Sequence, residues 1–155
     1  GAAAVLRYGE KFGDVDLIVN VAGRFDTTQT PRSRFTEEQW NQLEETGSFV
    51  VGETFRLAKS HVLSAVYACF LRDPFHLAAS LSSRRSKVLT IHGKDDATIP
   101  VADAFEFDRV LPNHNHDLVV VEGATHNFAT APEQMKVIEA LAPYVVGGVD
   151  PSAEK

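Results

Sequence analysis

The sequence predicts an α/β fold in which a parallel sheet is flanked by helices. Three short, nearly continuous apolar runs, at 17–21, 88–91 and 118–121, are typical of strands buried on both faces, as parallel strands are. Segments with helical periodicity precede, separate and follow these runs, so helices are available to cover both faces of the sheet.

The first helix is expected at residues 1–12, which are rich in alanine and stop at Gly13. A second, amphipathic helix is expected at 101–110, directly after Pro100. Its apolar side carries Ala104, Phe105 and Leu111.

The last helix is expected at 133–146, where apolar residues recur at helical spacing and Pro143 interrupts the pattern. The recurring residues are Met135, Ile138, Leu141 and Val145.

The chain is predicted to consist of a partial core, at 1–26 and 84–147, into which a lid is inserted. The lid, at 27–83, lies between the first two predicted strands and is expected to be mainly helical. Residues 148–155 form a polar tail with no packing signal.

Within the lid, Thr36 is a good N-cap, and Gln39 stands at the capping-box position of a helix that ends near Glu45. Residues 48–56 alternate loosely, as in a small hairpin, and 57–82 are expected to be mostly helical. Large apolar side chains are frequent throughout, and most of them are expected to pack the lid itself.

Composition limits the function. With 155 residues the chain is one domain at most, and its formal charge of -6 argues against nucleic acid or an anionic membrane as partner. A single cysteine, Cys69, excludes an internal disulfide and offers no metal framework, which favours a reducing, cytoplasmic compartment. No apolar run approaches the roughly 20 residues of a membrane span, and the first residues do not resemble a signal peptide. No cofactor is predicted, and the oligomeric state is left open.

Polar residues with catalytic potential follow two of the predicted strands. Asp95 and Asp96 come just after the strand at 88–91, and His126 lies in the loop after the strand at 118–121. The carboxyl ends of neighbouring parallel strands meet at one edge of the sheet, where open α/β sheets bind ligands. A carboxylate that orients an imidazole supplies two of the three groups of a nucleophilic triad.

These residues lie in two motifs, His-Gly-x-x-Asp-x-x-Ile-Pro from His92 and Glu-Gly-Ala-x-His-x-Phe from Glu122. Together they resemble the carboxyl-terminal half of an α/β-hydrolase of the serine esterase, lipase and aminopeptidase type, most clearly over 87–146. The resemblance implies that Asp96, not Asp95, is the catalytic acid and that His126 is the general base.

The same resemblance implies where the nucleophile lies. Gly1 matches the last glycine of the Gly-x-Ser-x-Gly nucleophile elbow, so the serine is expected two residues upstream of residue 1. The serines inside the chain do not stand in such a motif, and none is nominated. The implied activity is cleavage of a small-molecule ester or amide, or of a peptide, through an acyl-enzyme, and the chain alone is expected to be inactive.

The other histidines and the cysteine have simpler interpretations. His92 ends a buried strand and is interpreted as a structural, hydrogen-bonded histidine, whereas His114 and His116 are placed in a solvent turn. No metal site is predicted there, because no carboxylate or cysteine with suitable spacing accompanies them. Cys69 is interpreted as a buried lid thiol.

Two other classes of function are open to test. A non-catalytic binding or partner module would bind acyl ligands in a lid pocket without turnover, but exposed sheet edges in such a short form favour aggregation. Residues 17–23 also resemble a strand and turn of short-chain dehydrogenases. Tyr8 and Lys11, however, have the wrong spacing for that family's Tyr-x-x-x-Lys motif, and no glycine-rich phosphate loop is present.

Overall fold

The computed structural model describes residues 1–26, 36–51, 55–58, 80–81, 85–111 and 114–146. Contacts within the chain divide it into two compact units. One unit comprises Gly1–Phe25 with Pro74–Lys155, and the other comprises Asp26–Asp73.

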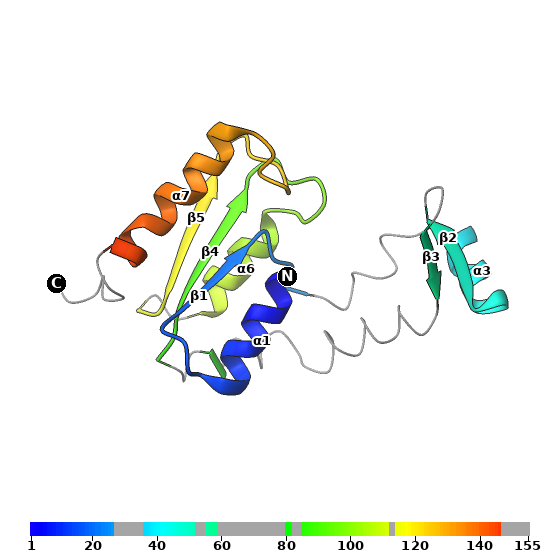
Figure 1. Cartoon of the computed structure of the whole chain (residues 1–155), viewed down its shortest axis with the longest axis horizontal. Helices are drawn as coiled ribbons and strands as arrows, with labels where there is room; N and C mark the ends of the chain where they lie inside the picture. The colour runs from blue at the N-terminus through cyan, green and yellow to red at the C-terminus, as the bar shows by residue number, and fades with distance from the viewer. Residues whose placement is uncertain (27–35, 52–54, 59–79, 82–84, 112–113, 147–155) are drawn as a thin grey trace. The chain divides into compact units, whose positions relative to one another are not determined.

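The first unit is built on a three-stranded parallel sheet with the strand order β1-β4-β5 (Figure 1). The strands are β1 (Leu17–Val21), β4 (Lys87–Gly93) and β5 (His116–Val121). The predicted strands are confirmed, but β5 begins two residues before its apolar run. His116 is therefore a buried strand residue, and its expected place in a solvent turn is wrong.

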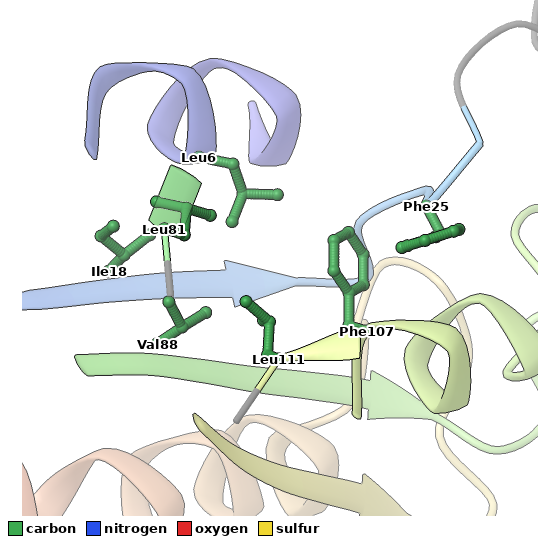
Figure 2. Packing of buried hydrophobic residues seen from close by; sticks show 7 residues of the cluster. All are labelled: Leu6, Ile18, Phe25, Leu81, Val88, Phe107 and Leu111. Atoms are coloured by element: carbon green, nitrogen blue, oxygen red, sulfur yellow. The ribbon is translucent and has the colours of Figure 1, made fainter. Parts of the chain in front are cut away.

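Helices cover both faces of this sheet. They are α1 (Ala2–Phe12), α6 (Ala102–Val110) and α7 (Ala131–Val146). On one face, residues of α1 and α6 pack against Ile18 and Val88, as Figure 2 shows. On the other face, α7 packs against a cluster that includes Leu89 and Ile91. Because neighbouring strand residues point to opposite faces, each strand contributes to both clusters.

Glycines allow α1 to end and to approach the sheet. Gly13 adopts φ 61° at the end of α1 and donates its amide to the Gly9 carbonyl, so the predicted glycine stop is confirmed. A Cβ on Gly9 would lie 2.1 Å from Ile18 Cδ1. The absence of a side chain at position 9 therefore lets the helix sit directly on β1.

The apolar faces of two helices differ from those expected. In α6, Phe105 is 52% exposed, and Phe107 is buried against the sheet in its place. In α7, three of the four apolar residues that recur at helical spacing are exposed, namely Met135, Ile138 and Val145. The residues that do pack are Val137, Ala140, Leu141 and Tyr144. Both helices carry two apolar stripes. The spacing of apolar residues does not determine which stripe packs against the sheet, and tertiary contact selects one of them.

The second unit contains a helix followed by a hairpin. Its elements are α3 (Glu37–Thr46), β2 (Ser48–Val51) and β3 (Phe55–Ala58), with β2 and β3 antiparallel. The predicted capping box between Thr36 and Gln39 is confirmed.

The predicted helix at 57–82 needs one correction, since residues 57 and 58 belong to strand β3, where hydrogen bonds to β2 hold them. Residues 80 and 81 are helical, and the rest of 57–82 lies outside the described residues, as do the tail at 148–155 and Cys69. No helix in the described part of the chain is long and apolar enough to cross a membrane.

Candidate active site

Asp96 lies in the turn after β4, and its side chain is buried in a cage of donors. Its Oδ1 accepts the backbone amides of Thr98 and Ile99, each at 2.8 Å. Burial raises the pKa of the Asp96 carboxyl, but the hydrogen bonds from Ile99, His126 and Thr98 outweigh burial and hold the pKa below its usual value. Asp96 is therefore a carboxylate at neutral pH.

His126 meets this carboxylate from the loop after β5. Its Nδ1 lies 2.7 Å from Asp96 Oδ2. A carboxylate only accepts hydrogen bonds, so Nδ1 carries the proton and Nε2 is the nitrogen left to exchange a proton with another group. The Asp96 side chain is fully buried, whereas that of His126 is 29% exposed. The buried carboxylate thus orients an imidazole that solvent can reach.

The neighbouring Asp95 does not share this geometry. It is exposed, and its backbone amide donates to the Ala124 carbonyl at 3.0 Å. Of the two aspartates in the turn, Asp96 is the one that contacts His126.

Close backbone packing brings the two loops together, and both lie at the same end of the sheet (Figure 1). The Lys94 amide donates to the Val121 carbonyl at 2.9 Å, in addition to the bond from Asp95 to Ala124. A Cβ on Gly93 would lie 2.3 Å from the Ala124 carbonyl oxygen. Gly93 is therefore needed for the loop that carries His126 to approach the end of β4.

His92 is buried beneath this pair, as expected for a structural histidine. Its Nε2 lies 2.9 Å from the Ile99 carbonyl oxygen, which fixes the proton on Nε2, and 3.4 Å from Asp96 Oδ2. The prediction that His92 is buried and hydrogen-bonded is confirmed. The His92 side chain supports the turn whose backbone amides hold Asp96.

The remaining candidates lie elsewhere. His116 is buried at the start of β5, where its Nε2 lies 3.0 Å from Thr90 Oγ1. His114 is exposed, just before that strand. Ser86 precedes β4, at the opposite end of the strand from Asp96, and donates its hydroxyl to the Val15 carbonyl at 2.6 Å. In the described ranges, no three side chains of the His, Cys, Asp and Glu types gather as metal ligands.

Two residues that the sequence did not single out contact the histidine loop. Glu133 accepts the amide of Thr125, and Gln134 donates to the carbonyl of Phe128. The available signal was Thr-x-x-Glu at 130–133, which is a capping box that starts α7 two residues earlier than expected.

No protein-family model matches the sequence, and no curated protein matches it. Solved structures do match, over nearly the whole chain. Alpha/beta hydrolase domain-containing protein 10 from mouse has a TM-score of 0.68 and 14% identity, with 95% of this chain and 59% of that chain covered. The chain has part of an α/β-hydrolase fold.

Two further structures with this fold agree. A monoacylglycerol lipase from Paleococcus ferrophilus has a TM-score of 0.66 and 15% identity, covering 95% of this chain and 65% of its own. A putative hydrolase from Agrobacterium vitis has a TM-score of 0.66 and 16% identity, covering 92% and 57%. The chain thus spans 57–65% of these three structures. The resemblance suggested by the two sequence motifs is confirmed for the fold.

Proposed function

We propose that this chain supplies the acid and the general base of a serine hydrolase that cleaves ester or amide bonds. The contact between His126 Nδ1 and Asp96 Oδ2, at 2.7 Å, carries the proposal. It joins a buried carboxylate to a partly exposed imidazole, as nucleophilic catalysis by a serine requires. The hydrolases with a similar fold support the same reaction class.

In this proposal the nucleophile is a serine from a part of the intact protein outside this chain. As its oxygen bonds to the substrate carbonyl carbon, its proton passes to His126 Nε2, and Asp96 stabilises the resulting imidazolium. His126 then gives the proton to the departing alcohol or amine, which leaves an acyl-enzyme. Water repeats the sequence: it loses a proton to Nε2 as its oxygen bonds to the acyl carbon. The bond from that carbon to the serine oxygen then breaks, His126 returns the proton to the serine, and the carboxylic acid leaves.

The substrate class we propose is a small-molecule ester or amide, or a peptide, in a cytoplasmic compartment. Residues 27–83 would shape the substrate pocket as a lid. The 155-residue chain alone should show no measurable turnover, because the members of a triad act as a unit.

The test uses the product of the complete open reading frame that encodes this chain, assayed on p-nitrophenyl acetate and butyrate. His126→Ala and Asp96→Asn should each lower kcat by about 10⁴-fold or more. Asp95→Asn and His114→Ala are matched controls, since each changes an exposed residue of the same type, and both should retain parental kcat. Full turnover by His126→Ala would exclude it as the base, and damage by Asp95→Asn alone would move the acid by one residue.

A further inference from the structure

The first turn of α7 contacts the loop around His126 on both sides. Glu133 Oε1 accepts the backbone amide of Thr125, the residue before His126, at 2.9 Å. Gln134 Nε2 donates to the carbonyl of Phe128, two residues after His126, at 3.1 Å. Two adjacent side chains of one helix thus hold the loop at 125 and at 128.

The Glu133 carboxylate does more than cap its helix. Its Oε2 accepts the amide of Thr130 at 2.7 Å and the Thr130 hydroxyl at 2.9 Å, which completes a capping box. Capping uses one carboxylate oxygen. The other is directed to Thr125, where it adds nothing to the helix and fixes the loop.

The second contact holds a residue in an unfavourable backbone conformation. Phe128 has φ 46°, in the left-handed region that a bulky residue seldom adopts, and its side chain is buried. Its amide donates to the Thr125 carbonyl at 3.3 Å, so the chain turns tightly around His126. A side-chain donor on the Phe128 carbonyl helps to maintain this turn.

The helix that provides these contacts is itself anchored to the sheet. Val137, Ala140 and Leu141 pack against the apolar cluster on the α7 face of the sheet, and the Tyr144 hydroxyl donates to Asp117 of β5. The loop that carries His126 is therefore fixed relative to the same sheet that carries Asp96.

We propose that Glu133 and Gln134 are positioning residues that hold His126 Nδ1 against Asp96 Oδ2. The catalytic consequence rests on the function proposed above, whereas the positioning itself can be measured without turnover. A purely structural role predicts that loss of Glu133 destabilises α7 and leaves the histidine in place.

Three variants separate these roles. Glu133→Gln is nearly isosteric, but its side chain keeps only one accepting oxygen. That oxygen serves the two donors of Thr130, as in a capping box with glutamine, so the amide nitrogen faces Thr125 and the link to the loop is lost. Thr130→Ala removes the hydroxyl of the capping box and leaves the link from Glu133 to Thr125 intact, which makes it the control for helix capping. Glu139→Gln changes an exposed glutamate of the same helix that pairs with Lys136.

The readout is the Nδ1–H resonance of His126 and its exchange rate with solvent, in ¹⁵N-histidine-labelled product of the complete open reading frame. Asp96→Asn identifies the resonance by shifting or removing it. We expect Glu133→Gln to broaden the resonance and to accelerate its exchange, and Thr130→Ala and Glu139→Gln to leave it as in the parent. Gln134→Ala should act in the same direction as Glu133→Gln.

Kinetics on p-nitrophenyl butyrate give the second readout. Glu133→Gln should lower kcat about tenfold with KM unchanged, because a small displacement of the base reduces stabilisation of the transition state more than it reduces substrate binding. An unchanged Nδ1–H resonance and exchange rate in Glu133→Gln would overturn the proposal, as would an equal effect of Thr130→Ala. If Glu133→Gln disturbs the resonance but His126→Ala retains turnover, the positioning is supported and the proposed function is not.

Discussion

Strand β5 has a histidine–aspartate pair at each end, and the two pairs are built in opposite ways. After the strand, His126 Nδ1 lies 2.7 Å from Asp96, whose side chain is fully buried while that of His126 is 29% exposed. At its start, His116 Nδ1 lies 3.2 Å from Asp108, and here the histidine side chain is 1% exposed and that of the acid is 52% exposed.

The difference shows what makes a histidine available as a base. Both nitrogens of His116 face partners within the protein, since Nε2 lies 3.0 Å from Thr90 Oγ1 and Nδ1 faces Asp108. His126 uses only Nδ1 for its acid. In the function proposed above, the partly exposed imidazole of His126 exchanges protons with a substrate, whereas we expect the buried imidazole of His116 to stabilise the fold.

Exchanging each histidine for glutamine should separate these roles most clearly. His126→Gln should lower kcat about 10⁴-fold in the product of the complete open reading frame, since the base is lost. It should change the free energy of unfolding by only about 1 kcal/mol, because Asp96 loses one hydrogen bond and keeps those from the amides of Thr98 and Ile99. His116→Gln should do the reverse, with kcat near the parental value and a loss of about 1–3 kcal/mol from disturbing a buried hydrogen bond.

Ester hydrolysis and urea unfolding, measured on both variants, test whether the two substitutions have these opposite effects on activity and stability. A His116→Gln protein that is fully folded yet inactive would show that the two ends of β5 are not independent. A His126→Gln protein that is fully active would remove the functional half of the comparison.

The next largest effect is expected at Gly93, where the end of β4 meets the histidine loop. In Gly93→Ala the new Cβ would lie 2.3 Å from the Ala124 carbonyl and 2.9 Å from that of Thr125, both backbone atoms. Overpacking of this kind costs about 1–3 kcal/mol. The displaced loop should also lower kcat by up to about 10²-fold.

Ala97→Gly, at an exposed position of the neighbouring turn, is the matched control, and it should leave kcat unchanged. Urea unfolding and ester hydrolysis measure both effects of Gly93→Ala. Parental values for both would mean that the loop can shift without moving His126.

A smaller effect is the pH dependence of stability that we expect from His116. Burial lowers the pKa of His116, and the nearby carboxylates of Asp108 and Asp117 offset this only in part, while Lys87 adds to it. As the pH is lowered, His116 therefore binds a proton in the unfolded chain at a higher pH than in the folded protein. The stability that His116 contributes is fully present above the ordinary histidine pKa of 6.5 and is lost as the pH falls through the lower folded pKa. The urea concentration at the midpoint of unfolding should fall as the pH is lowered from about 8 to about 5, and it should fall less in His116→Gln. Equal slopes in parent and variant would contradict this assignment.

That an aspartate after β4 would lie near His126 could be predicted because it depends on topology, whereas the choice of Asp96 over Asp95 rested on the resemblance of the motif. Residues just after neighbouring parallel strands meet at one edge of the sheet, whatever the details of packing. The role of Glu133 could not be predicted in the same way. Its capping box is readable from the sequence, but the reach of its second oxygen to Thr125 depends on where the loop lies in space.

The pair of His116 and Asp108 could not be predicted, for a related reason. His116 follows two polar residues and starts a strand, so its neighbours suggested a turn, and only the pairing with β4 buries it. In α6, periodicity places Phe105 and Phe107 on different sides of the helix but does not say which side meets the sheet. Local pattern predicts elements and strand ends, and tertiary contact decides which side chains are buried.

The smallest predicted effect tests whether α7 transmits changes from one end of the sheet to the other. The Tyr144 hydroxyl donates to Asp117, which also pairs with Lys87 at 3.1 Å, near the start of β4 and β5. Burial, together with this bond, raises the pKa of Tyr144, so it remains a donor across the working pH range. Tyr144→Phe should cost about 1 kcal/mol in urea unfolding.

Tyr8→Phe is the matched control, since it removes an exposed hydrogen bond from Tyr8 of α1 to Asp14 and should cost less. Tyr144→Phe should leave the Nδ1–H resonance of His126 unchanged, because Glu133 and Gln134 fix the loop at the other end of α7. A shift of that resonance in Tyr144→Phe, and not in Tyr8→Phe, would mean that the whole helix moves as a rigid lever. The position of His126 would then depend on contacts at both ends of α7.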